Sequence, residues 1–365
     1  MNTHFAVLGR QKKLSIYELT WVVNEGYNVQ WSVVFFTIDD ENKLKHLGGI
    51  KKRGRLFGDL EQLWEYVTHV STFDKSRQEL AGTNEDTLWM TLKKKYGFKR
   101  YKHVDMGKAD LDIKKGGLEI HSLEEWHGLV LWRQHIWLYE KIDFDKPVSG
   151  MEIGMMPSKL AHLLVNIWIA QIPVWDISKD ITIRDPFVGF GTTGFIVNNM
   201  WHNFIWSDMN IVPFKTNKKW RLTIPLAQED KHFTAFKHDM HDPLTQPFLE
   251  HVDVIVTEWR LGPVIKKNPY KLTRKYGQAT AMEAFDRGIT EIVNTYTDFI
   301  QNVFTTMPTV PVVMTVPHYT FMDEDTIWEK LEAKLTSIWA DIEQVDIYAR
   351  KKQKVARRVV IVKKR

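Results

Sequence analysis

The chain has 365 residues, a net charge of +5 and no cysteine. This length predicts about two or three domains, and a hydrophobic fraction of 44% is enough for a sizeable core. Without cysteine there are no disulfides, zinc–cysteine sites or thiol nucleophiles, and we predict no metal site. The start of the chain lacks the pattern of a signal peptide, and no run of about 18 apolar residues predicts a membrane span. We therefore expect a soluble cytoplasmic protein without a membrane partner.

Residues 1–58 predict a small α+β unit with no catalytic features. Its helix is expected over 14–19, with Ser15 as the N-cap and Glu18 three residues further on. The expected strands cover 5–10, 31–38 and a segment that begins at 48.

The sequence predicts a second unit over residues 59–140 and a linker over residues 141–150. Helices are expected over 60–70 and 87–96, and paired strands over 118–121 and 128–132. Lysine and arginine alternate with aromatic residues over 93–103, a pattern that suits contacts with phosphates and stacking on bases. A solvated helix end with buried aromatic side chains is the alternative.

Residues 151–365 predict one α/β domain. Apolar residues recur at helical spacing after Pro157, and strands then alternate with helices. The expected strands cover 180–184, 204–208, 234–239, 252–258, 310–316, 345–348 and 358–362, and the expected later helices cover 280–305 and 323–339. This order predicts a doubly wound sheet that closes with an antiparallel pair.

The segment Asp185-Pro-Phe-Val-Gly-Phe-Gly-Thr-Thr-Gly194 lies between an expected strand and a helix over 195–201. A phosphate-binding P-loop is disfavoured because no lysine follows Gly191. The three glycines fit a dinucleotide-binding turn, which is a weak match by itself. The third interpretation is a methyltransferase loop, because the leading acid and the Pro-Phe pair are both present. An ordinary glycine turn is the bland alternative.

Acidic residues end the next two expected strands. Asp208 lies 17 residues after Gly191 in the sequence, a spacing that suits an acid that accepts from ribose hydroxyls. Asp239 could contact an adenine amino group. For Asp208 a surface-loop acid is the alternative. The basic, aromatic segment 214–221 is a further candidate contact for nucleic acid. Residues 350–365 hold nine Lys or Arg and no acid, which suits a polyanionic partner or a solvated tail.

Three sequence motifs follow one another along the chain: Gly154-Met-Met-Pro-Ser-Lys-Leu-Ala161, Asp185-Pro-Phe-Val-Gly-Phe-Gly-Thr192 and Val254-Ile-Val-Thr-Glu258. Together they resemble the THUMP-associated tRNA guanine-N2 methyltransferases. The resemblance implies a Rossmann-like class I methyltransferase domain with a mostly parallel seven-stranded sheet and a terminal antiparallel hairpin. It also implies a ferredoxin-like unit over 1–58 and a short or degenerate THUMP-like RNA-binding unit over 59–140.

The same resemblance implies S-adenosylmethionine as cofactor. The implied contacts are Asp185, Pro186, Phe187, Gly189, Gly191 and Thr192 in the turn, Asp208 at the ribose, Asp239 at the adenine, and Met156 and Lys159 at the methionine end.

The family's catalytic motif is Asp-Pro-Pro-Tyr-Gly, and this chain departs from it. At the matching position it reads Glu258-Trp259-Arg260-Leu261-Gly262. Glu258 can still accept from the amine of the target base, Trp259 can replace the stacking ring that holds a flipped base, and Arg260 can grip a phosphate. The alternative is a loop that has lost catalysis.

The sequence thus predicts methyl transfer to an exocyclic base nitrogen of structured RNA, namely N2 of a tRNA guanosine. A DNA amino-methyltransferase and a catalytically altered RNA-binding module are the two alternatives. The α+β region ahead of the catalytic domain favours RNA, because it resembles an RNA-docking arm.

Overall fold

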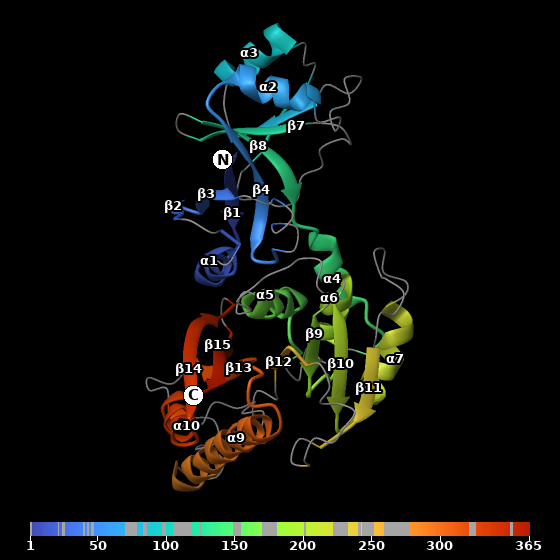
Figure 1. Ribbon diagram of the computed structural model, residues 1–365, viewed down its shortest axis with the longest axis vertical. Helices are drawn as coiled ribbons and strands as arrows, with labels where there is room; N and C mark the ends of the chain where they lie inside the picture. Colours follow the sequence, from blue (N-terminus) through green and yellow to red (C-terminus); the bar gives the residue numbers. More distant parts are fainter. Residues whose placement is uncertain are drawn as a thin grey trace. The chain divides into compact units, whose positions relative to one another are not determined.

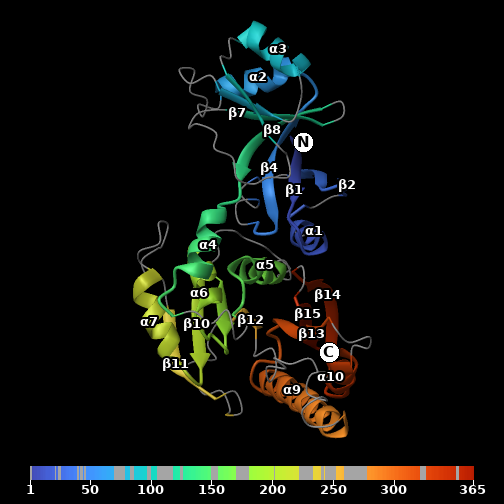
Figure 2. The same ribbon diagram turned by 180° about the vertical axis from the view of Figure 1, so that it is seen from behind.

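The computed structural model describes residues 2–20, 22–23, 26–38, 41, 44, 47–69, 79–82, 86–96, 100–104, 118–123, 126–148, 155–169, 181–200, 202–221, 233–239, 242, 252–258, 278–320, 326–350 and 353–365. Contacts are given for these residues only. The chain divides into two compact units, Met1–Trp137 and Leu138–Arg365, whose elements can be followed in Figure 1 and, from behind, in Figure 2.

Unit 1 contains an eight-stranded sheet in the order β2-β3-β1-β4-β8-β7-β5-β6. The strands are β1 (Asn2–Leu8), β2 (Asn28–Gln30), β3 (Val33–Ile38), β4 (Ile50–Phe57), β5 (Glu79–Gly82), β6 (Arg100–His103), β7 (Leu118–Leu123) and β8 (Trp126–Arg133). Its helices are α1 (Lys12–Thr20), α2 (Leu60–His69) and α3 (Asp86–Tyr96). β4 pairs with both β1 and β8, so the strands from 1–58 and those from 59–140 form one continuous sheet.

The expected helix near the N-terminus exists, but the expected cap is wrong. Ser15 lies inside α1, and its hydroxyl donates to the carbonyl oxygen of Gly49 at 2.7 Å. The buried Glu18 carboxylate accepts from the backbone N–H groups of Gly48 and Gly49 at 2.6 Å each. Ser15 and Glu18 therefore connect α1 to the segment before β4. Their side chains provide hydrogen-bond partners for the buried backbone groups of Gly48 and Gly49.

A buried charge cluster joins the middle strands of this sheet. The Glu119 carboxylate on β7 accepts from Lys52 Nζ on β4 at 2.7 Å and from Arg133 Nε on β8 at 2.6 Å. It also lies 2.6 Å from Nε2 of His121. Lys52, Glu119 and His121 are all at most 1% exposed. Burial raises the pKa of Glu119, but the hydrogen bond from His121, the charge of Arg133 and the hydrogen bond from Lys52 outweigh it and hold that pKa at about 2.

Glu119→Gln should lower the free energy of unfolding by about 3–5 kcal/mol, because it leaves buried cations without their anion. The folded-state pKa lies below the usual value of 4.5, so the stabilisation is complete above pH 4.5 and is lost as the pH falls towards about 2. Urea unfolding of both proteins across this pH range would check it. If the difference in unfolding free energy between the two proteins did not decrease as the pH falls, the assigned role of the Glu119 carboxylate would be contradicted.

Unit 2 contains a seven-stranded sheet in the order β11-β10-β9-β12-β13-β15-β14. The strands are β9 (Thr182–Asp185), β10 (Asn203–Asp208), β11 (Phe233–Lys237), β12 (Val254–Glu258), β13 (Val312–Tyr319), β14 (Ala340–Tyr348) and β15 (Val355–Lys364). β9 to β13 are parallel, and β15 is antiparallel to both β13 and β14. This mostly parallel sheet with a terminal antiparallel hairpin confirms the predicted Rossmann-like α/β architecture.

The helices of unit 2 are α4 (Ile136–Phe144), α5 (Ser158–Ile169), α6 (Thr192–Asn199), α7 (Val212–Arg221), α9 (Gln278–Thr306) and α10 (Thr326–Ser337). Residues of β12 and β13 show which helices pack against these two strands. Ile255, Val312 and Met314 pack in one cluster with residues of α9 and α10, whereas α5 packs near β12 and β13. No helix in the described part of the chain is long and apolar enough to cross a membrane.

The predicted linker 141–150 is in part regular structure. α4 extends to Phe144, so the first residues of that range are helical. Tyr139 Oη on α4 lies 2.7 Å from His162 Nδ1 on α5, and the backbone N–H of Ser158 donates to Asp143 Oδ1 at 2.8 Å. The described residues of this range, 141–148, therefore belong to the packed part of unit 2.

Candidate functional site

The glycine turn follows β9 and leads directly into α6. Gly189 and Gly191 have φ values of +48° and +84°, in the left-handed region where a side chain would be strained. The N–H of Gly191 donates to the carbonyl oxygen of Val188 at 2.8 Å, which closes the turn. Gly191 then occupies the N-cap position of α6, with no side-chain cap. Within the described residues, the first N–H groups of the helix therefore have no capping side chain.

The third glycine of the motif serves packing. A Cβ at Gly194 would lie 2.0 Å from the Trp206 ring on β10, so only glycine lets α6 approach the sheet this closely. Phe187, predicted to contact a cofactor, packs its ring against Phe299 of α9 with the centroids 5.2 Å apart. Part of this motif therefore holds the turn in place rather than facing a ligand.

Asp185 is buried at the end of β9 and joins two strand ends. Its Oδ1 accepts from the N–H of Phe187 at 3.0 Å and from Thr257 Oγ1 on β12 at 2.6 Å. Burial raises the pKa of Asp185 to about 6, although hydrogen bonds from Thr257, Phe187 and Thr193 work against it. The nearby Asp208 charge raises it further. The carboxylate is therefore poised to titrate just below neutral pH.

Asp208 ends β10 and reaches back to the glycine turn. Its Oδ2 accepts from the N–H of Gly189 at 2.8 Å, and its Oδ1 accepts from the N–H of Asn210 at 2.8 Å. Each oxygen has a second lone pair for a further donor. Asp239 follows β11, is half-buried, and its carbonyl oxygen accepts from the N–H of Asp242. The two acids thus follow neighbouring parallel strands, as predicted.

A buried lysine beside the turn was missed by the sequence analysis. Lys146 is 4% exposed, and its Nζ donates to Thr192 Oγ1 at 2.8 Å. Burial lowers the pKa of Lys146 to about 8, while the charge of Asp143 opposes this shift. Lys146 falls in the predicted linker, and no signal in the sequence connects it with the turn 46 residues away.

Asn217 on α7 fixes this lysine segment against the turn. Its side-chain amide exchanges hydrogen bonds with both backbone groups of Val148, at 3.0 and 2.8 Å, and also donates to the carbonyl oxygen of Phe190 at 3.1 Å. Asn217 is fully buried. The segment 214–221 is predicted as a nucleic-acid contact. It therefore also contains a buried residue, Asn217, that connects the lysine segment to the glycine turn.

Glu258 ends β12, and its carboxylate is already engaged. Its Oε2 accepts from Arg357 Nε at 2.5 Å and from Thr315 Oγ1 at 3.1 Å, and its Oε1 accepts from Arg357 Nη2 at 3.0 Å. Both side chains of the pair are at most 5% exposed. Arg357 Nη2 also donates to the carbonyl oxygen of Met155 at 3.3 Å. Burial raises the pKa of Glu258, although Arg357 and Thr315 oppose this.

The remaining predicted site residues divide between described and undescribed parts of the chain. Met156 is buried just before α5, and Lys159 is half-buried in its first turn. Pro186 is buried beside Asp185. Trp259 and Arg260 lie outside the described residues.

Two arginines of the basic C-terminal segment are built into the sheet. Arg357 and Arg358 are 4% and 5% exposed within β15, and the Arg358 guanidinium lies 4.7 Å from the centroid of the Trp328 ring. Neither side chain is free to meet a polyanion. In unit 1, Lys93 and Lys94 of α3 are exposed.

Glu258→Met and Arg357→Met should each lower the free energy of unfolding by about 3–5 kcal/mol, because each leaves a buried charge unpaired. The double variant should cost less than the sum of the two by at least about 1 kcal/mol. Urea unfolding of the four proteins checks this, with the exposed Arg350→Met as control. Additive losses would show that the two side chains do not depend on each other.

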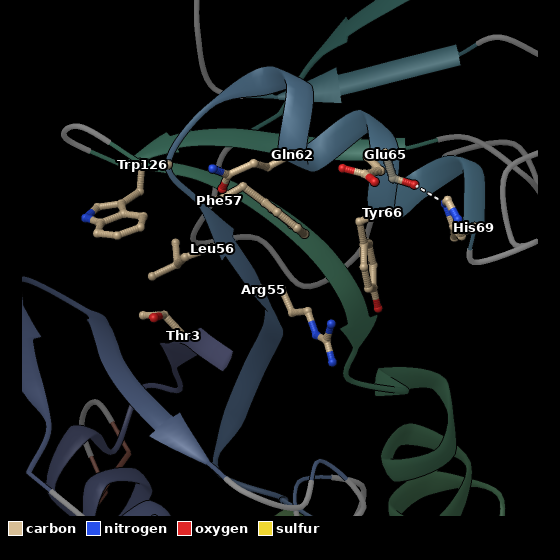
Figure 3. A pocket seen from close by; sticks show the side chains of 10 residues that line it. Thr3, Arg55, Leu56, Phe57, Gln62, Glu65, Tyr66, His69 and Trp126 are labelled. Carbon is tan, nitrogen blue, oxygen red and sulfur yellow. Dashed lines mark hydrogen bonds between the residues drawn. The ribbon is translucent and has the colours of Figure 1, made fainter. Parts of the chain in front are cut away.

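A hollow of about 500 Å³ lies in unit 1, lined by β4, α2 and residues of β1 and β8 (Figure 3). The Arg55 guanidinium lies 4.7 Å from the centroid of the Tyr66 ring and is ion-paired with Glu41. Phe57 stands beside Tyr66, with ring centroids 5.3 Å apart. Because its one arginine is already paired and Glu65 also lines it, this hollow has no net positive charge to attract a polyanion.

No family model matches the chain, and no curated protein matches it in sequence. Solved structures similar to it include TYW2 of Pyrococcus horikoshii in complex with MeSAdo, at 12% identity and a TM-score of 0.35, covering 60% of this chain and 67% of that one. The rRNA methyltransferase aviRa from Streptomyces viridochromogenes has 11% identity and a TM-score of 0.36, covering 63% and 94%. Magnesium protoporphyrin IX methyltransferase from Synechocystis with bound SAM has 9% identity and a TM-score of 0.36, covering 62% and 90%. With likenesses this low, function has to come from the residues of the site.

Proposed function

We propose that the chain is a methyltransferase that moves a methyl group from S-adenosylmethionine to an exocyclic base nitrogen of structured RNA, namely N2 of a tRNA guanosine. One observation carries the proposal. The glycine turn after β9, Asp208 after β10 and Glu258 at the end of β12 all lie at the carboxyl edge of one parallel sheet. Ligands of open α/β sheets bind at this edge.

The residues of this edge fit the cofactor. The turn exposes backbone N–H groups at the start of α6, and Asp208 keeps acceptor capacity for ribose hydroxyls. Asp185 is a buried acid that is better stabilised as a carboxylate when a cation is nearby. When bound, the cofactor supplies an electrophilic methyl group on a positively charged sulfur. A phosphate-binding P-loop is a poorer fit. The carboxylates of Asp185 at the end of β9 and Asp208 at the end of β10 lie beside the turn and would repel a phosphate.

In this proposal the protein's part is mainly positioning. The exocyclic amine of guanine is a weak nucleophile, so rate depends on holding its nitrogen in line with the methyl group. Glu258 Oε1 accepts one hydrogen bond from Arg357 and can accept another from the amine. Arg357 fixes that carboxylate, and Trp259 and Arg260 would hold the flipped base and its phosphate. Unit 1 would dock the RNA, with the exposed lysines of α3 as candidate contacts.

S-adenosylmethionine affinity should rise roughly tenfold between pH 5 and pH 7, because the Asp185 carboxyl must lose its proton to stabilise the cationic cofactor. Asp185→Asn should weaken binding at pH 7 and flatten this pH dependence. Calorimetric titration of both proteins measures it. An unchanged pH dependence in the variant would remove Asp185 from the cofactor site.

Labelled S-adenosylmethionine should transfer its methyl group to unmodified tRNA and give N2-methylguanosine on nucleoside mass spectrometry, while DNA assayed in parallel stays unlabelled. Glu258→Ala should slow this transfer by about 10²–10⁴-fold, with folding checked by circular dichroism.

Other outcomes of this assay separate the alternatives. Label in DNA would favour the DNA amino-methyltransferase, and label in a different nucleoside would assign a different base to the reaction loop. No label in either substrate, with cofactor binding intact, would favour the RNA-binding module.

A further inference from the structure

The ammonium group of Lys146 is buried, and in the described part of the chain it has no anionic partner in direct contact. Its Nζ donates to Thr192 Oγ1 at 2.8 Å and lies 5.8 Å from the centroid of the Phe195 ring. Among the described side chains no carboxylate forms an ion pair with it. The charge of Asp143 acts on Lys146, but the Oδ1 of this acid accepts from the N–H of Ser158 at the start of α5. An ammonium has three donors, and one is accounted for here.

One neighbour of this cation is the positive end of a helix. Thr192 is the first residue of α6, and the uncapped start of a helix carries a partial positive charge from its open N–H groups. Burying a cation at the positive end of a helix is costly unless an anion joins it. Asn217 holds the lysine segment there through Val148 and holds the turn through Phe190, so the arrangement is built into the fold.

We infer that Lys146 binds the carboxylate of the methionine part of S-adenosylmethionine, together with the start of α6. This inference rests on the proposed function and adds to it a residue outside the glycine motif. The carboxylate would compensate the positive charge of Lys146 and the partial positive charge at the start of α6. Thr192, which accepts a hydrogen bond from Lys146, is the first residue of that helix. Lys146 would therefore select nucleosides that carry an amino-acid carboxylate over those that lack one.

The test compares two nucleosides in calorimetric titrations of the full chain. S-adenosylhomocysteine carries the carboxylate, and 5′-methylthioadenosine lacks it. Lys146→Met should weaken binding of S-adenosylhomocysteine about tenfold or more, and change that of 5′-methylthioadenosine by less than about twofold. Lys146→Arg should keep most of the preference for the carboxylate. Lys141→Met, a change on α4 near Lys146 in sequence, should leave both affinities as they are.

An equal loss of both affinities in Lys146→Met would overturn the inference, because it would mean that the lysine only supports the turn. Should that variant not fold, the natural chain is titrated with S-adenosylhomocysteine and its methyl ester. A preference of about tenfold for the free carboxylate supports the inference, and equal affinities overturn it. If the natural chain binds neither nucleoside, the proposed function itself fails, which is a different result from binding without discrimination.

Discussion

The carboxyl edge of the seven-stranded sheet depends on carboxylates whose hydrogen bonds join one strand end to the next. Asp185 accepts from Thr257 across β9 and β12, and Asp208 accepts from Gly189 across β10 and the turn. Glu258 accepts from Arg357, which joins β12 to the terminal hairpin. Parallel strands bring these ends together, and the side-chain hydrogen bonds connect them. Any ligand at this edge therefore meets a surface whose shape is fixed by buried polar contacts.

The same contacts explain why positioning can serve as the main catalytic device. Glu258 is held from two sides, by Arg357 and Thr315, and Arg357 also holds the carbonyl oxygen of Met155 ahead of α5. The expected acceptor for the base amine and the residue before Met156, which is expected at the methionine end, thus share one arginine. A carboxylate fixed in this way orients a nitrogen well, whereas its pairing limits how much proton charge it takes up.

Much of the fold could be predicted from sequence, because strands and helices leave periodic patterns and the glycine turn has a distinctive composition. The partners of the site residues could not. Lys146 meets Thr192 over 46 residues, Asn217 meets Val148 over 69, and Arg357 meets Glu258 over 99. No local pattern marks such pairs. Ser15 shows the converse error, since a local capping pattern was present but its hydroxyl bonds to Gly49 through the tertiary structure.

The most direct test of the central claim is a crystal structure of the full chain with S-adenosylhomocysteine. We predict that the adenosine lies over the glycine turn with its ribose hydroxyls at Asp208, and that the carboxylate of the homocysteine part lies between Lys146 and the start of α6. A nucleoside bound elsewhere on the molecule, or one whose carboxylate points away from α6, would contradict the account.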